Sequence, residues 1–291
     1  MAAPPTPPPA AVKRGMFTTV LLVIVMLALG FVAGAFIGPR YGFGYQPPKE
    51  TPLQNVVVGT NTPFPPFEYR NTTTQALIGL DIDLINEIGA RSHWNVVWRD
   101  FQDWDTLLAA IQFRGVDIGA SSITSSGATG ASRNATMTFS NYYYIADQAV
   151  LIKSGTTAVA CPGAECTPND LANHTVAVQT LTSSFNWVND NLVSTNLTPA
   201  SRVHDFGDLN SVIQELVNGN VEFVLVDKPI AQNFANANPS LVIAGPIITN
   251  EQYSYATAKD DPGGFIAKIN SALADMKADG TFKRIMDKWL S

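Results

Sequence analysis

The sequence is poor in charge and in histidine, and both shortages exclude classes of function. Charged residues make up 14% of its 291 residues, and the net charge is −6. The longest basic run is Lys13-Arg14, so no cluster of cations is available to collect the phosphates of a nucleic acid. The three histidines, at positions 93, 174 and 204, are too scattered to form a metal site. We therefore expect no nucleic-acid partner, no metal and no other cofactor.

Cysteine is also scarce, and the only two cysteines of the sequence lie close together. Cys161 and Cys166 enclose the segment CPGAEC. In an exported protein, a pair this close with proline and glycine between its members is expected to close a small disulfide loop. Half of a zinc site is the alternative reading, but the sequence offers no suitable partner ligands. We predict a disulfide whose stabilising effect is local, because the loop is short.

One segment has no charge at all. Residues 16–38, MFTTVLLVIVMLALGFVAGAFIG, are long enough to cross the hydrocarbon core as one helix. Lys13 and Arg14 precede it, so the positive-inside rule keeps the proline-rich start, residues 1–15, in the cytoplasm and exports the rest. The alternative is a cleaved signal segment with a small-residue site at Ala33-Gly34-Ala35. The apolar run exceeds a usual signal core of about 7 to 15 residues, which favours a membrane anchor over a secreted or periplasmic product.

The exported part begins with a linker and continues with an α/β pattern. Residues 39–54 are rich in proline, glycine and tyrosine and lack periodicity, which is typical of a tether. From residue 55 onward, short apolar runs alternate with segments of helical period, as in βαβ units. Leu84, Ile85 and Ile88 predict the inward face of a helix over 81–90. The pattern restarts after Lys153, so we expect two α/β lobes.

Arg133 is the most informative single residue. It stands between a loop of small and hydroxyl-bearing residues and the strand that contains Phe139-Ser140. A guanidinium holds a carboxylate through two parallel charge-assisted hydrogen bonds, and small neighbours leave room for backbone N–H groups to complete the shell. The loop residues are Ala120, Ser121, Ser122 and Thr124. We predict that Arg133 anchors a ligand carboxylate.

Six segments in a fixed order carry a resemblance to a known family. They are VVVGTNTPFPPFEY with GLDIDLINEIGAR, WDTLLAAIQFRGVDIGASSIT, RNATMTFSNYYY, VAVQTLTSS, LVNGNVEFVLVDKP and DGTFKRIMDKWL. The chain resembles the extracellular solute-binding proteins of polar amino-acid ABC transporters, family 3, over residues 55–291. The resemblance implies the two-lobed periplasmic-binding-protein fold of type II, with each lobe a sheet flanked by helices. Lobe 1 would be 55–150 plus 250–291 and lobe 2 would be 151–249, with hinge strands near 148–153 and 245–257.

The resemblance also implies a ligand site between the lobes. Arg133 matches the arginine that grips the ligand α-carboxylate, and Asp227 matches the carboxylate that pairs with the ligand ammonium. Phe64 and Trp104 match aromatic positions against the ligand side chain, whereas Phe67 is expected in the core. The remaining residues implied to bind the ligand are Asn61, Ala120, Ser122, Thr182 and Ser183. Asn61 stands where binders of basic amino acids often carry an acid, which favours a neutral polar ligand such as glutamine.

Two departures from the family pattern bear on this site. Members usually have two residues between the loop threonine and the arginine, whereas SSGATGAS separates Thr124 from Arg133 here. The insertion either bulges into solvent or alters the rim of the pocket. Leu181 replaces the customary glycine of the turn before Thr182, and the loss of backbone freedom puts the conformation of that turn in question.

The expected function is capture of an amino acid for delivery to an ABC transporter permease, without catalysis. The same fold also hosts cyclohexadienyl dehydratases, which need a carboxylic acid placed over the substrate. Glu68, Glu87 and Glu165 are the candidates for such an acid, but Glu87 belongs on a helix face and Glu165 lies within the cysteine loop. A ligand-sensing ectodomain is the third possibility, and it would require a separate signalling partner.

Overall fold

The computed structural model describes residues 26, 53–157 and 159–290. The predicted cytoplasmic start, the predicted membrane segment 16–38 except for Met26, and the linker as far as residue 52 lie outside the described residues. Within the described residues, no helix has both the length and the apolar character needed to span a bilayer.

Most of the described strands join one mixed sheet of nine strands. Eight of them follow the order β4, β1, β5, β11, β7, β10, β8 and β9, and β6 pairs with β11 off this path. Their bounds are β1 Gln54–Asn61, β4 Trp94–Phe101, β5 Ile118–Thr124, β6 Met137–Phe139, β7 Tyr144–Lys153, β8 Val176–Gln179, β9 Val203–Phe206, β10 Phe223–Asp227 and β11 Leu241–Ala258. A separate hairpin pairs β2 (Tyr69–Arg70) with β3 (Leu77–Ile78).

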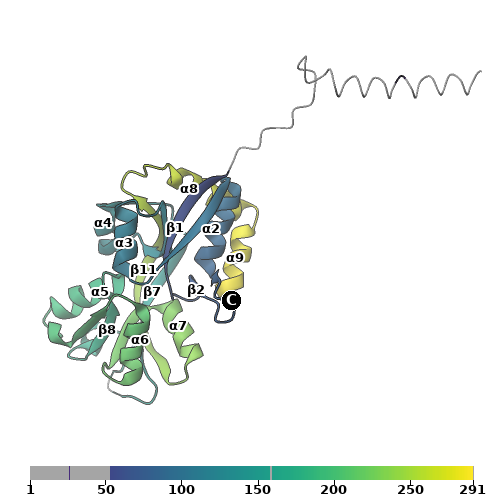
Figure 1. The fold of residues 1–291 in the computed structure, drawn as a ribbon. Helices are drawn as coiled ribbons and strands as arrows, with labels where there is room; N and C mark the ends of the chain where they lie inside the picture. Colours follow the sequence, from purple (N-terminus) through teal and green to yellow (C-terminus); the bar gives the residue numbers. More distant parts are fainter. Residues whose placement is uncertain (1–25, 27–52, 158, 291) are drawn as a thin grey trace, which may run out of the picture. The chain divides into compact units, whose positions relative to one another are not determined.

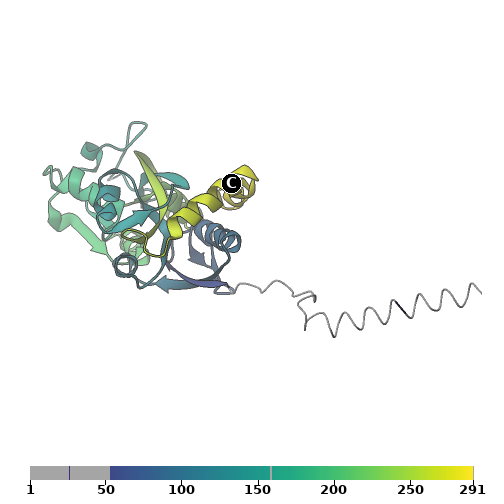
Figure 2. The same ribbon diagram turned by 90° about the horizontal axis from the view of Figure 1, so that it is seen from above.

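Two sides of this sheet can be distinguished by their helices. What we call the β1 side contains strands β4, β1, β5 and β6 with helices α2 (Leu80–Arg91), α3 (Trp104–Gln112), α4 (Gly127–Asn134), α8 (Phe265–Ala278) and α9 (Thr281–Leu290), of which α4 contacts β6 and α9 contacts α2 and α8. Figures 1 and 2 both show α2 beside the yellow C-terminal helices, although more than 170 residues separate them in the chain. On the β10 side, strands β10, β8 and β9 carry α5 (Ser183–Val188), α6 (Leu209–Asn218) and α7 (Lys228–Ala237). This side also contains the short 3₁₀ helices η1 (Pro168–Leu171) and η3 (Ala200–Arg202) and the π-helix η2 (Asn189–Val193).

The helical periods of the sequence correspond to buried faces. Leu84, Ile85 and Ile88 on α2 are fully buried, as the spacing predicts. On α6, the buried residues are Leu209, Val212, Ile213 and Leu216. Gly219 ends α6 with a φ of 80°, the left-handed conformation that only glycine adopts without strain.

Strands β7 and β11 connect the two sides. They pair with each other from Leu241 opposite Lys153 to Tyr253 opposite Tyr144, with two breaks in register, one between Ile243 and Gly245 and one between Ile247 and Glu251. On one edge of this pair, β11 continues to β5, and on the other, β7 continues to β10. Both strands therefore belong to both sides, and they contain the segments 148–153 and 245–257.

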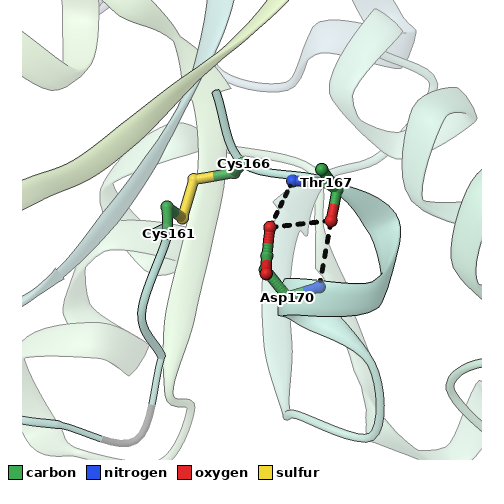
Figure 3. Close-up of a disulfide and its surroundings, with 4 residues drawn as sticks. All are labelled: Cys161, Cys166, Thr167 and Asp170. Atoms are coloured by element: carbon green, nitrogen blue, oxygen red, sulfur yellow. Dashed lines mark hydrogen bonds between the residues drawn. A yellow bond between two sulfur atoms is a disulfide. The ribbon is translucent and has the colours of Figure 1, made fainter. Parts of the chain in front are cut away.

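The predicted disulfide is present between Cys161 and Cys166, with Cα atoms 4.8 Å apart. Gly245 of β11 faces it, because a Cβ on this glycine would lie 2.8 Å from the Cys166 sulfur. Figure 3 shows the capping box that follows, in which the Thr167 backbone N–H donates to Asp170 at 2.8 Å. The disulfide thus closes a small loop that lies against strand β11, where the Cys166 N–H donates a hydrogen bond of 2.8 Å to the carbonyl oxygen of Pro246.

Candidate functional site

A cavity lies where four strands end. β1 ends at Asn61, β5 at Thr124, β8 at Gln179 and β10 at Asp227, and all four residues line it. The carboxyl ends of strands are where open α/β sheets bind ligands. The remaining lining residues are Phe64, Glu68, Trp104, Ser121, Ser122, Arg133, Thr182 and Ser183. The structure therefore brings together every predicted ligand-binding residue except Ala120.

Arg133 is buried against this cavity, with 8% of its surface exposed. Its Nη1 donates to the carbonyl oxygen of Thr124 at 3.0 Å, and its Nη2 donates to the carbonyl oxygen of Leu181 at 3.0 Å. The guanidinium also lies over the Trp104 ring, 5.3 Å from the centroid. Burial lowers the pKa of Arg133 to about 10, so the group stays charged at neutral pH. These bonds use two of its five N–H groups.

The insertion before Arg133 folds as α4 and does not bulge into solvent as a loop. Gly130 makes this possible, because a Cβ there would lie 2.1 Å from the carbonyl carbon of Ser125. Arg133 stands in the last turn of α4, and Thr129, Gly130 and Arg133 form the buried face of the helix. The longer spacer thus keeps the arginine at the cavity and adds a helix to the rim.

Asp227 faces the cavity from the β10 side and is 7% exposed. It occupies the N-cap position of α7, but its side chain makes no capping hydrogen bond. Instead, its Oδ1 accepts a hydrogen bond of 2.6 Å from the side-chain amide of Gln148. Burial, followed by the nearby carboxylate of Glu251, raises the pKa of Asp227 well above its usual value. A ligand cation beside Asp227 would relieve this cost, because an opposite charge favours the ionised carboxylate.

Gln148 and Glu251 belong to the site's polar network, although no sequence motif singled them out. Gln148 is fully buried on β7, and its amide donates to both Asp227 and Glu251, at 2.6 and 2.8 Å. Glu251 also accepts a hydrogen bond of 2.9 Å from the Thr124 hydroxyl. Gln148 accepts one of 2.6 Å from Ser184. The shared strands therefore connect Asp227 on one side with Thr124 on the other.

Asn61 and the two aromatic residues form the wall toward β1. The Asn61 amide donates to the carbonyl oxygens of Phe101 and Gln102, at 2.8 and 3.0 Å. Its oxygen accepts a hydrogen bond of 3.2 Å from Gln179, on the opposite side. Phe64 is half-buried, whereas Trp104 is 6% exposed and lies both on the cavity and in the core.

Ser121 and the predicted Ser122 line the cavity, whereas the predicted Ala120 does not. Ala120 is fully buried and packs in the core behind the strand. Successive strand residues point to opposite faces, but Ser122 has a φ of 49°, which breaks the alternation and turns both serines toward the cavity. Ser121 donates a hydrogen bond of 2.7 Å to Glu68.

Glu68 is a buried carboxyl in the cavity wall, with 1% of its surface exposed. Burial and then the neighbouring Asp81 raise the pKa of Glu68 well above its usual value. Burial also raises the pKa of Asp81 to about 7, although hydrogen bonds from Tyr143 and Ser122 oppose the shift. The β1 side therefore holds two buried carboxyls that favour their uncharged forms.

The turn before α5 has the left-handed conformation that favours glycine, although Leu181 occupies this position. Leu181 has a φ of 59°, in the left-handed region. Its carbonyl oxygen accepts hydrogen bonds from Arg133 and from the indole of Trp104, at 3.0 and 3.2 Å. Thr182 caps α5 by accepting a hydrogen bond from the Phe185 N–H at 3.2 Å. Ser183 follows it on the cavity wall.

Two of the three glutamates considered as catalytic acids lie away from the cavity. Glu87 pairs with Arg91 on α2 at 2.8 Å, and Glu165 is exposed in the disulfide loop. Glu68 alone of the three lines the cavity.

Comparison with known proteins decides the family. The model of the bacterial extracellular solute-binding proteins, family 3, matches residues 56–291. The chain belongs to this family. Its relatives are substrate-binding proteins without enzymatic activity. This family 3 protein is 26% identical to the L-cystine-binding protein TcyA of Bacillus subtilis, over 80% of each chain. It is 23% identical to the ABC transporter arginine-binding protein 1 of Escherichia coli, over 92% of its own length and 98% of the relative.

Solved structures give the same fold. An ancestral arginine-binding protein bound to arginine superposes with a TM-score of 0.73 and 28% identity, over 83% of the family 3 chain and 100% of the other. An ancestral arginine-binding protein bound to glutamine gives a TM-score of 0.71, also at 28% identity, over 81% of this chain and 97% of the other. The described α/β architecture is thus that of amino-acid-binding proteins of ABC transporters.

Proposed function

We propose that this protein captures an amino acid with a neutral polar side chain and delivers it to an ABC transporter permease. One observation carries the proposal: a buried cation, Arg133, and a buried carboxylate, Asp227, line one cavity from opposite sides. Arg133 would hold the α-carboxylate with its remaining N–H groups, and Asp227 would pair with the α-ammonium. Aromatic surface from Phe64 and Trp104 would cover the side chain.

Capture would be coupled to closure of the cleft. The β1 and β10 sides would act as two lobes, with β7 and β11 as the hinge between them. The open form would offer Arg133 alone or Asp227 alone, whereas the closed form would satisfy both ends of the zwitterion. Ligand binding would therefore shift the population toward the closed form. The permease would recognise that closed form.

The wall around the side chain supports a neutral polar ligand. Asn61 presents an amide where an acid would favour a basic ligand, and that amide is already bonded to protein carbonyl groups. Glu68 also lines the cavity, and its raised pKa favours the uncharged carboxyl. An uncharged carboxyl can donate to and accept from a side-chain amide such as that of glutamine.

The N-terminal segment would hold the receptor at the cell membrane, close to the permease. We propose that residues 16–38 anchor the chain in the cell membrane and that residues 39–54 tether the binding region outside it. A tether of this length would raise the effective concentration of the receptor at the permease.

A thermal-shift screen of the full chain against the twenty amino acids tests the proposal. A ligand at 100 times its Kd stabilises the folded state by about 2.7 kcal/mol, which raises the melting temperature by roughly 5 to 10 °C. We expect this shift for a neutral polar amino acid and none with Arg133→Met. Arg284→Met removes an exposed arginine from α9 and serves as the control. The proposal fails if no amino acid raises the melting temperature or if Arg133→Met responds as Arg284→Met does.

A further inference from the structure

The helix α4 that the insertion forms makes a contact across the cleft. The side-chain amide of Asn186, on α5, donates a hydrogen bond of 3.0 Å to the hydroxyl of Thr129 on α4. Thr129 is 9% exposed and Asn186 is half-buried. Because α4 belongs to the β1 side and α5 to the β10 side, this bond can exist only while the two sides touch.

This bond differs from other contacts across the cleft because it lies outside the candidate ligand cavity. Neither Thr129 nor Asn186 lines that cavity, and both line a second cavity between α4 and α5. The contacts from Arg133 and Trp104 to Leu181, and from Gln179 to Asn61, all involve cavity residues. A ligand would touch or displace those residues, but it would leave Thr129 and Asn186 in place.

Hydrogen bonds to strand β11 fix the position of helix α4, which contains Thr129. The Ser125 N–H and hydroxyl both donate to the carbonyl oxygen of Gln252, at 2.8 and 3.1 Å. The Gln252 N–H donates in return to the Ser126 hydroxyl at 2.9 Å. Gly130 then packs directly on Ser125. The start of α4 is thus fixed to strand β11, so Thr129 is held in position before Asn186 reaches it.

We propose that Thr129 and Asn186 form a latch that stabilises the closed form and so sets how long a bound amino acid stays. The inference rests on the proposed function. A contact present only in the closed form raises the fraction of closed molecules, and the apparent Kd falls by the same factor. A neutral hydrogen bond of ordinary strength corresponds to roughly a fivefold change in the ratio of closed to open molecules. Opening must break the bond, whereas encounter with the open form does not involve it, so the effect falls on dissociation.

Stopped-flow displacement of the bound amino acid from the full chain tests the latch, with the fluorescence of Trp104 in the cavity wall as a signal. We expect Thr129→Val and Asn186→Ala each to raise the dissociation rate about fivefold, with the association rate unchanged. The double variant should dissociate no faster than either single variant, because both remove the same bond. Asn186→Leu keeps about the size of the side chain but removes both the amide donor and the amide acceptor, and it should behave as Asn186→Ala does.

Ser132→Ala is the matched control, since it removes a hydroxyl from the exposed face of the same helix. A merely structural role would lower the melting temperature of the ligand-free protein, which the latch leaves unchanged. Dissociation rates of the single variants equal to that of Ser132→Ala would overturn the latch and leave the proposed function intact. Multiplicative effects in the double variant would also overturn it. Absence of binding by the wild type would overturn both.

Discussion

The guanidinium of Arg133 donates a hydrogen bond of 3.0 Å to the carbonyl oxygen of Leu181, which belongs to the β10 side. That carbonyl group points toward the arginine because Leu181 adopts a left-handed conformation, with a φ of 59°. Leu181, which replaces the family glycine on the β10 side, thus contacts Arg133, which follows the insertion on the β1 side. Both departures are accommodated at one point of the cleft.

Leu181→Gly should raise the free energy of unfolding by up to about 1 kcal/mol. A left-handed residue with a Cβ costs roughly 1 to 2 kcal/mol of folding free energy. Glycine removes this strain, but it also increases the conformational entropy of the unfolded chain, which offsets part of the stabilisation. Leu181→Ala keeps the Cβ and loses a side chain that is 47% exposed, so it should change stability little. Chemical denaturation of the two variants measures the difference. A glycine variant less stable than the alanine variant would contradict the strain.

Stability should fall as the pH rises from about 4 to 7. The pKa of Asp81 is raised by burial to about 7 in the folded protein, from an ordinary value near 3.8. Over that window the folded state binds more protons than the unfolded state, so the free energy of unfolding decreases with pH. The slope for one such carboxyl is at most about 1.4 kcal/mol per pH unit. Raised pKa values at Glu68 and Asp227 act in the same direction.

Asp81→Asn should flatten this dependence, because the amide has no proton to lose. Its oxygen can still accept the hydrogen bonds from the Tyr143 hydroxyl and the Ser122 N–H, which are 2.8 and 2.9 Å long in the wild type. Urea denaturation of both proteins at pH 5, 6 and 7 compares the slopes. Parallel slopes for wild type and variant would show that Asp81 does not titrate in this window.

Removal of the disulfide should cost stability but not affinity. The pair Cys161→Ser and Cys166→Ser opens a loop with a sequence separation of five, for which loop-closure entropy gives a loss of about 2 kcal/mol. Neither cysteine lines the candidate cavity, so the amino-acid Kd should stay that of the wild type. Denaturation with and without reducing agent provides the control, since only the wild type should respond to reduction. A weakened Kd would instead place the loop in the ligand site.

Sequence periodicity and motifs predicted much of this arrangement. Leu84 and Ile88 repeat at helical spacing because both pack inward from one face of α2. Arg133 was predicted from the small, hydroxyl-bearing loop before it and from the family resemblance, whereas Asp227 was predicted from the resemblance, and both line one cavity. The resemblance thus indicated which residues stand at the cavity.

Other features depend on contacts that no local pattern records. The segment GATGASRN has two glycines and no apolar period, and it forms a helix because Gly130 fits against Ser125 and β11 supports its start. Gln148 and Glu251 are 103 residues apart in sequence, and only the pairing of β7 with β11 brings them to Asp227. Ala120 was misplaced because the positive φ of Ser122 interrupts the strand alternation.

Calorimetry with a matched pair of ligands measures whether Arg133 holds a ligand α-carboxylate. Glutamine and glutaminamide differ only in that carboxylate. A charge-assisted bidentate contact predicts that the wild type binds glutamine at least about 100-fold more tightly than the amide, and that Arg133→Met abolishes this preference. Equal affinity of the wild type for the two compounds, or an unchanged preference in Arg133→Met, would show that Arg133 does not hold the carboxylate.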